Sequence, residues 1–129
     1  MVDGGLRKIF RQYLTGVDWQ AIESGGTGGG IPDLNGCIAG KELWIECKAA
    51  AAWRVKISPA QVAWAERRLR HGGRVFLAVR RAGTELWLFP GWSMRVLCGW
   101  RLDLIPALGR WYGGPARWDW EQVRKLLSS

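Results

Sequence analysis

Two stretches, Ile31-Pro32-Asp33-Leu34 and Trp44-Ile45-Glu46-Cys47-Lys48, decide the fold and the chemistry of this chain. Both are rich in apolar residues, and the Gly-containing segment Ala39-Gly40-Lys41 lies between them. This pattern predicts a β-hairpin with strands over residues 33–38 and 42–48. Side chains alternate between the two faces of a strand, so two sets should separate: Leu43, Ile45 and Cys47 on one face, and Trp44, Glu46 and Lys48 on the other.

The register of this hairpin decides which side chains meet. A two-residue turn on Ala39-Gly40 places Asp33 opposite Glu46, and a turn on Gly40-Lys41 places it opposite Lys48. Either register gathers the two carboxylates and the amine on one face. Such a group is typical of a divalent-metal site with an amine beside it that handles protons or faces phosphate. The alternative is a salt bridge on the surface of a hairpin.

Length and charge restrict the partners of the chain. Its 129 residues suit one domain with one hydrophobic core. Nineteen Lys and Arg against eleven Asp and Glu give a net charge of +8, which favours a polyanionic partner, with nucleic acid the first candidate. A basic but inert protein is the alternative. A cationic chain with a local pair of carboxylates suits phosphodiester cleavage, because the cations hold the backbone and the carboxylates hold a metal.

The cysteines and the histidine argue against a structural zinc site. Cys37, Cys47 and Cys98 form no CxxC pair, and His71 is the single histidine. The sequence has no apolar run of the length of a membrane span, and its first residues have no apolar segment of a signal peptide. We therefore expect reduced thiols and a cytoplasmic protein without a membrane partner.

Further periodic patterns complete an α/β order of elements. They predict helices over residues 5–15, from Ser58-Pro59 to Gly72, and from Asp119 to Leu127, and strands over Trp19–Glu23, 74–80 and 85–89. This order predicts a mixed β-sheet flanked by helices. The loop Ser24–Gly30 is either a flexible linker or a segment that lets the backbone approach DNA closely. Residues 90–118 show no steady period.

The order of these pieces resembles the PD-(D/E)xK nuclease superfamily, and within it the small stand-alone VRR-NUC type, many of which are phage-encoded. The resemblance covers residues 19–89. It rests on Gly30-Ile31-Pro32-Asp33-Leu34, on Ile45-Glu46-Cys47-Lys48 and on Ser58-Pro59-Ala60-Gln61-Val62-Ala63-Trp64. It implies a restriction-endonuclease-like fold and Mg²⁺- or Mn²⁺-dependent hydrolysis of a DNA phosphodiester. If the chain is phage-encoded, it would act in the host cell cytoplasm.

The resemblance also assigns roles to single residues. It implies that Asp33 and Glu46 bind the catalytic ion, with the carbonyl group of Cys47 as a further ligand. Lys48 would orient or activate the attacking water, or stabilise charge on the phosphoryl oxygens. Gln61 would either contact the active site or only cap its helix, because Ser58-x-x-Gln61 is also a capping box.

One departure from the family pattern concerns the first helix. In the family an acidic residue on this helix often joins the metal site, but residues 5–15 contain neither Asp nor Glu. Glu23 is the upstream carboxylate best placed to substitute, and Asp18 is a poorer candidate. Glu23 would then bind the metal, directly or through water. The alternative is a solvated residue at the end of a strand.

The resemblance implies a structure-selective endonuclease that resolves branched DNA such as Holliday junctions. Symmetric cutting of two strands favours a homodimer, and the Trp-rich extension over residues 90–129 would supply the interface, fill a small core, or do both. Two alternatives remain: a sequence-specific endonuclease of the restriction or homing type, and a non-catalytic DNA-binding module on the same fold. The second is disfavoured, because a binding protein gains nothing from two carboxylates facing phosphate.

Overall fold

A computed structural model describes residues 3–23 and 29–129 of the chain as a six-stranded mixed sheet with helices on both faces. The elements are α1 (Leu6–Tyr13), β1 (Asp18–Ala21), β2 (Leu34–Ile38), β3 (Lys41–Ala50), α2 (Pro59–Arg70), β4 (Val75–Arg81), β5 (Glu85–Pro90), α3 (Ser93–Leu97), β6 (Gly109–Trp111) and α4 (Trp120–Ser128), with 3-10 turns at Leu102–Leu104 and Pro115–Arg117. The strands follow one another in chain order across the sheet. β3 and β4 pair in parallel, and the other neighbouring pairs are antiparallel. The predicted mixed sheet flanked by helices is confirmed.

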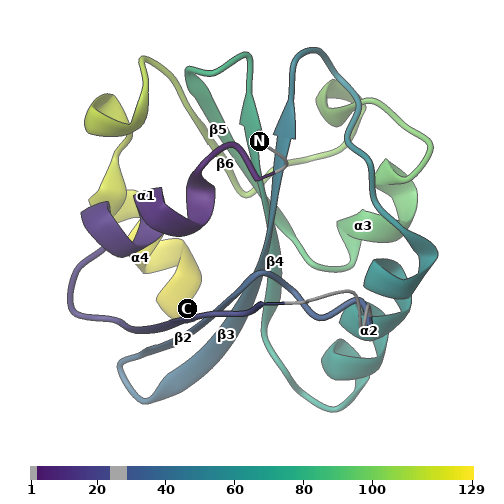
Figure 1. Ribbon diagram of the computed structural model, residues 1–129, viewed down its shortest axis with the longest axis horizontal. Helices are drawn as coiled ribbons and strands as arrows, with labels where there is room; N and C mark the ends of the chain where they lie inside the picture. The colour runs from purple at the N-terminus through teal and green to yellow at the C-terminus, as the bar shows by residue number, and fades with distance from the viewer. Residues whose placement is uncertain (1–2, 24–28) are drawn as a thin grey trace.

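The sheet separates two apolar cores. Figure 1 shows α1 and α4 on one side of the sheet and α2 and α3 on the other. Alternate residues of β3 enter opposite cores: Leu43, Ile45 and Cys47 pack in the first, and Trp44 and Ala50 in the second. The predicted division of this strand into two faces is therefore confirmed, and Glu46 and Lys48 point toward the α2 side.

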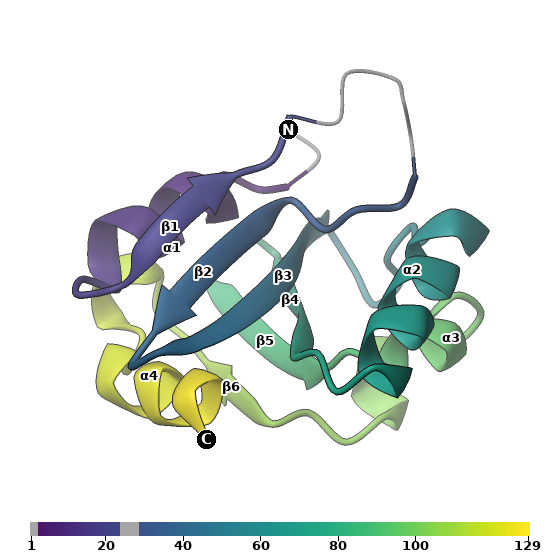
Figure 2. The ribbon, with the colours of Figure 1, turned by 90° about the horizontal axis from the view of Figure 1, so that it is seen from below.

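The β2–β3 hairpin adopts the first of the two possible registers. Ile38 pairs with Lys41 and Leu34 with Ile45, so the turn consists of Ala39 and Gly40. Both turn residues have positive φ, 52° and 77°, as a type I′ hairpin turn requires. Asp33, one residue before β2, consequently lies opposite Glu46 of β3, the strand that runs beside β2 in Figure 2.

Helix α2 begins as the sequence predicts. The backbone N–H of Gln61 donates to the side chain of Ser58 over 3.2 Å, and the Ser58 N–H donates to the side chain of Gln61 over 2.9 Å. This capping box, with Pro59 at the first helical position, starts the helix beside the C-terminal half of β3. Trp64 is 5 % exposed and packs on Trp44 in the apolar core between α2 and the sheet.

Several short elements differ from the sequence predictions. The segment 90–118 contains α3, β6 and both 3-10 turns, each of three to five residues and therefore too short to show a period. Strand β1 ends at Ala21, so Glu23 lies beyond the strand and not at its end. The glycine-loop prediction falls mainly on residues 24–28, which lie outside the described residues. Among the described helices, none combines the length and the apolar character needed to span a bilayer.

Candidate active site

The hairpin register brings the two predicted metal carboxylates together. Asp33 Oδ2 accepts a hydrogen bond from the backbone N–H of Cys47 over 3.0 Å. Continued by two pairs beyond Leu34, the register sets Cys47 opposite Pro32, which has no N–H. Pro32 therefore cannot donate to the Cys47 carbonyl group, which leaves this oxygen available to a cation beside Asp33. The thiol of Cys47 is buried in the core on the opposite face.

Glu46 is a buried carboxylate with an incomplete set of partners. Its side chain is 2 % exposed, and burial together with the nearby charge of Asp33 raises its pKa to about 9, although Lys48 acts in the opposite direction. Within residues 3–23 and 29–129, Glu46 Oε1 has no hydrogen-bond partner. A buried carboxylate oxygen without a partner, beside a second carboxylate, is unfavourable unless the group takes up a proton or a cation neutralises the pair. The donor set fits a hard divalent ion, which prefers oxygen ligands.

Lys48 points toward the same carboxylate. Its side chain is 10 % exposed, and its Nζ lies 3.7 Å from Glu46 Oε2. An ammonium group held beside two carboxylates can donate to a phosphoryl oxygen or to an attacking water at the same place. The structure therefore brings Asp33, Glu46 and Lys48 together, as the alternation of side chains on β3 predicts.

Gln61 performs both of the roles between which the sequence left a choice. Its Oε1 accepts from the N–H of Ser58 in the capping box. Its Nε2 donates to Glu46 Oε2 over 3.2 Å. The amide has an acceptor and a donor on opposite sides, so one side chain caps α2 and holds the glutamate.

The structure does not bring Glu23 to this pair of carboxylates. Glu23 is exposed and lines an open pocket of about 420 Å³ beside α1, together with Arg7, Lys8 and Arg11. Across the described part of the chain, no three His, Cys, Asp or Glu side chains form a group that could hold a metal ion. Asp18 is exposed at the start of β1, where it pairs with Cys37, away from Asp33 at the other end of β2.

Asp3 is a buried carboxylate that the sequence analysis missed. It is 9 % exposed and accepts hydrogen bonds from the Gly5 N–H over 3.0 Å and from Arg7 Nε over 3.1 Å. Burial would raise its pKa, but these hydrogen bonds outweigh that effect and lower it. Its charge contributes to the raised pKa of the Cys47 thiol, after burial and the charges of Asp33 and Glu46, so it lies near β3. The signal was available as Asp3-Gly4-Gly5, a carboxylate and two glycines directly before the first helix.

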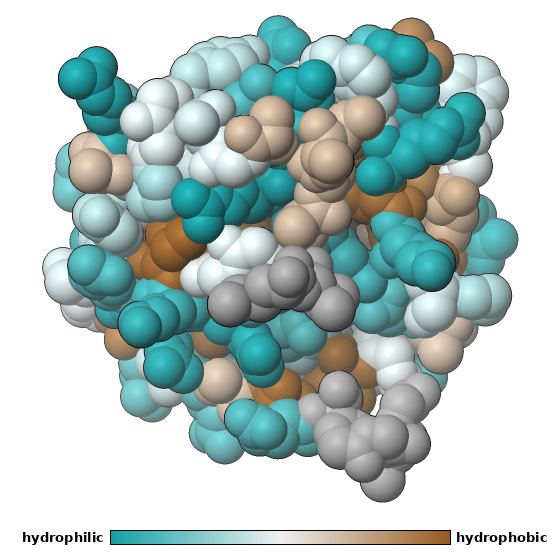
Figure 3. Space-filling view, turned by 45° about the horizontal axis from the view of Figure 1, so that its top comes forward, coloured by the Kyte–Doolittle hydropathy of each residue, from teal (hydrophilic) through white to brown (hydrophobic). Residues whose placement is uncertain are grey.

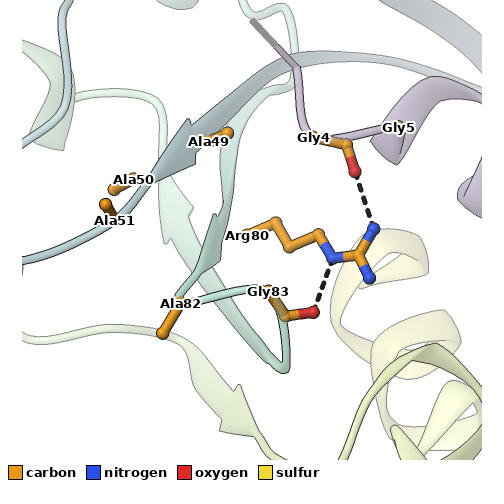
Figure 4. Close-up of a pocket in the computed structure, with 8 residues that line it drawn as sticks. All are labelled: Gly4, Gly5, Ala49, Ala50, Ala51, Arg80, Ala82 and Gly83. Atoms are coloured by element: carbon orange, nitrogen blue, oxygen red, sulfur yellow. Dashed lines mark hydrogen bonds between the residues drawn. The ribbon is translucent and has the colours of Figure 1, made fainter. Parts of the chain in front are cut away.

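A second pocket lies at the ends of β3 and β4, directly after Lys48. It has a volume of about 650 Å³ and is lined by Gly4, Gly5, Ala49, Ala50, Ala51, Arg80, Ala82 and Gly83. Figure 4 shows the Arg80 guanidinium between two backbone carbonyl groups, those of Gly4 and Gly83, to which it donates over 2.8 Å each. Arg80 thereby ties the segment before α1 to the strand next to the site.

Comparisons with known proteins agree with this geometry. The family model of the archaeal Holliday junction resolvase (Hjc) matches residues 7–96, well over half of the chain. Among solved structures, Archaeoglobus fulgidus Hjc, a Holliday junction resolvase from an archaeal hyperthermophile, is similar with a TM-score of 0.50 at 15 % identity, over 67 % of this chain and 74 % of that chain. At this identity the structural likeness supports the fold alone. No curated protein matches the sequence.

The family match includes every residue of the candidate site: Asp33, Glu46, Cys47, Lys48 and Gln61. The chain therefore belongs to the archaeal Holliday junction resolvase family, which is part of the PD-(D/E)xK nuclease superfamily, and its function is that of a structure-selective endonuclease on branched DNA.

Proposed function

We propose that the chain hydrolyses DNA phosphodiester bonds at four-way junctions with Mg²⁺ or Mn²⁺ held by Asp33, Glu46 and the carbonyl group of Cys47. The observation that carries this proposal is the buried Glu46 Oε1 without a hydrogen-bond partner in the described residues, opposite Asp33 and beside Lys48. When bound, the ion supplies Lewis acidity at the phosphoryl group and lowers the pKa of water.

Other groups of the chain hold the two carboxylates in place and assist the attack on the phosphodiester. The Cys47 N–H fixes the carboxylate of Asp33, and Gln61 fixes one oxygen of Glu46, which leaves the other oxygen free to bind. Lys48 donates a hydrogen bond to the attacking water or to the phosphoryl oxygen on which negative charge develops. This role requires an amine that is held in place and largely excluded from solvent.

The test compares a four-way junction with a linear duplex of matched sequence, in Mg²⁺, in Mn²⁺ and in EDTA. The wild type should cleave the junction only with metal, and Asp33→Asn and Glu46→Gln should bind the junction without cleaving it. Glu42→Gln, an exposed glutamate on the same strand, is the matched control and should cleave at the wild-type rate. Metal-dependent cleavage by Asp33→Asn would contradict the assignment. Cleavage of one linear sequence would favour a restriction- or homing-type enzyme, and binding without cleavage a DNA-binding module.

We propose that a third carboxylate, either Glu23 or Asp3, contacts the metal through a water ligand, because in the described part of the chain neither forms a ligand group with Asp33 and Glu46. Asp3 is favoured, because it is buried and its charge acts on the Cys47 thiol, whereas Glu23 is exposed. Asp3→Asn should raise the Mg²⁺ concentration required for cleavage, with partial recovery in Mn²⁺, which tolerates poorer oxygen sites. Glu23→Gln should leave the metal titration unchanged. If Glu23→Gln raised the required Mg²⁺ concentration and Asp3→Asn left it unchanged, Glu23 would be the third carboxylate.

We propose that residues 1–129 form one nuclease domain that acts as a homodimer through its Trp-rich part, residues 90–129. Large exposed apolar side chains support this, since several lie in that segment: Trp92, Trp100, Leu104, Leu108 and Tyr112. Trp111 and Trp118 are buried and fill the core instead. Sedimentation of Trp100→Ser/Leu104→Ser should show a monomer where the wild type and the control Lys125→Ser show a dimer.

We further propose that the chain is a VRR-NUC type member that acts in the cytoplasm, or in the cytoplasm of the host if it is phage-encoded. The motif Ser58-Pro59-x-Gln61-x-x-Trp64 supports the subtype, because each of its named residues has a structural task at the start of α2. Screening cleavage of junctions against single-stranded and flapped DNA would separate this type from other resolvases.

A further inference from the structure

Gly30 packs directly against the backbone of the first turn of α2. A Cβ atom on Gly30 would lie 2.1 Å from the carbonyl oxygen of Ala60, 2.3 Å from its carbonyl carbon and 2.7 Å from the nitrogen of Gln61. All three are backbone atoms, so no side chain can rotate to make room. Gly30 also has a φ of +73°, which disfavours other residues. Figure 2 shows the chain passing beside α2 on its way to β2.

This contact joins the two halves of the active site. On one side, only Ile31 and the buried Pro32 separate Gly30 from Asp33, and the proline ring stiffens this short link. On the other side, the nitrogen that Gly30 contacts belongs to Gln61, whose side chain holds Glu46. The Cys47 N–H on β3 closes the ring by holding Asp33. The separation of the two carboxylates therefore depends on how closely Gly30 approaches α2.

We infer that Gly30 is a positioning residue for the nuclease reaction: its close approach to the Ala60–Gln61 peptide sets Asp33 and Glu46 at the separation that one metal ion requires. This inference rests on the proposed function. A methyl group at this position must move the segment and the helix apart by about 1 Å before its contacts become tolerable. A displacement of this size at an active site typically reduces the rate by about a hundredfold.

The chain offers a matched control at the opposite end of the same helix. Gly72 has a φ of +82°, and a Cβ atom there would have no heavy atom within 4 Å. Gly72→Ala therefore introduces the same left-handed backbone strain as Gly30→Ala without the steric clash. A difference between the two variants isolates the effect of the contact.

The experiment measures three quantities at a temperature well below the Tm of both variants: the single-turnover rate on a four-way junction, the Mn²⁺ concentration for half-maximal rate, and the NMR signal of the Gln61 side-chain amide, assigned with Gln61→Glu. Gly30→Ala should lose about a hundredfold in rate, need more Mn²⁺ and move the Gln61 signal toward that of a free amide. Gly72→Ala should match the wild type in all three. A folded Gly30→Ala with wild-type values would overturn the inference, even if its Tm is reduced.

Two further measurements keep the inference testable if Gly30→Ala does not fold. Insertion of one glycine between Ile31 and Pro32 keeps the contact of Gly30 with α2 but lengthens the segment between Gly30 and Asp33 by one flexible residue. Asp33 is then no longer held at a fixed distance from α2, so the insertion should reproduce the loss of rate. In the wild type, a nuclear Overhauser contact should join the Gly30 Hα to the Gln61 amide proton. An active insertion variant, or the absence of that contact, would overturn the inference. If the wild type cleaves no DNA, the proposed function fails, and the Gln61 signal and this contact still test the role of Gly30.

Discussion

At the scale of single residues, Glu46 shows how burial creates a demand for a cation. The folded chain holds this carboxylate nearly free of solvent, opposite Asp33, with one oxygen lacking a partner in the described residues. Glu46→Gln keeps the shape and needs no proton to be neutral. Without metal, the variant should be at least as stable as the wild type, and up to about 1–3 kcal/mol more stable, because the interior no longer holds a carboxyl group that must take up a proton near neutral pH or stay charged.

Adding Mg²⁺ should make the wild type more stable than Glu46→Gln. The wild type should gain in Tm because the ion binds the folded chain, whereas the variant should gain little. Thermal unfolding in EDTA and in Mg²⁺ checks both statements. An equal rise of Tm in the two proteins would mean that the ion binds elsewhere.

Lys48 supplies a second prediction at this scale. Its amine contacts Glu46 but adds no oxygen ligand, so Lys48→Ala should reduce the single-turnover rate by about a hundredfold with little change in the metal titration. Lys41→Ala, an exposed lysine at the other end of β3, should behave as the wild type. A collapse of metal binding in Lys48→Ala would indicate a structural role for the amine.

At the scale of elements, the β2–β3 turn fixes the site. Ala39 adopts a φ of 52° in a turn that favours Asn-Gly, so Ala39→Asn should stabilise the protein by about 0.5–1 kcal/mol without changing cleavage. Urea unfolding measures the gain. Ala52→Asn is the control, since Ala52 is exposed and has no positive φ. A destabilised Ala39→Asn protein would show that the type I′ geometry is wrong.

Elements with strong local signals could be predicted from the sequence. The start of α2 is predicted by the capping residues Ser58 and Gln61 together with Pro59. The alternation of side chains with a period of two predicts the two faces of β3. The register of the hairpin could not be chosen, because two adjacent turns satisfy the same pattern and an alanine at positive φ is an unfavourable choice. The short elements between residues 90 and 118 depend on contacts with distant parts of the chain: β6 pairs with β5, α3 packs on α2 and β5, and the turn at Pro115–Arg117 packs on α1.

Tertiary contacts explain the remaining differences at the site. Whether Gln61 caps a helix or holds Glu46 depends on where β3 lies, and it does both. Asp3 stands before the first helix, so a search within residues 5–15 could not find it. Its burial follows from the contacts of the chain before α1 with Arg7 and, through Gly4, with Arg80.

At the scale of the whole molecule, a cationic chain surrounds a small acidic site. The net charge is +8, while Asp33 and Glu46 face each other at the start of β2 and within β3. The face in Figure 3 is largely hydrophilic, with hydrophobic side chains scattered in it. A chain with this net charge attracts the DNA backbone without reading its sequence.

The basic face of α1 gives a prediction for DNA binding. Lys8 and Arg11 are exposed and line the pocket that also contains Arg7, whose pKa is raised mainly by Asp3 and also by the charges of Asp33 and Glu23. If these cations contact phosphates beside the site, Lys8→Ala and Arg11→Ala should each weaken junction binding regardless of sequence. Each should also lower the slope of log affinity against log salt by about one unit.

Lys125→Ala is the control for this prediction, because Lys125 is exposed on α4 and does not line the pocket. Titrations of a labelled junction from low to moderate salt, with catalysis blocked by Glu46→Gln, measure the slopes. Since Glu46 lies in the interior, the blocked enzyme keeps the surface charges on which binding depends. Equal slopes for Arg11→Ala and Lys125→Ala would indicate that the DNA does not bind along α1 but near the pocket beside Arg80.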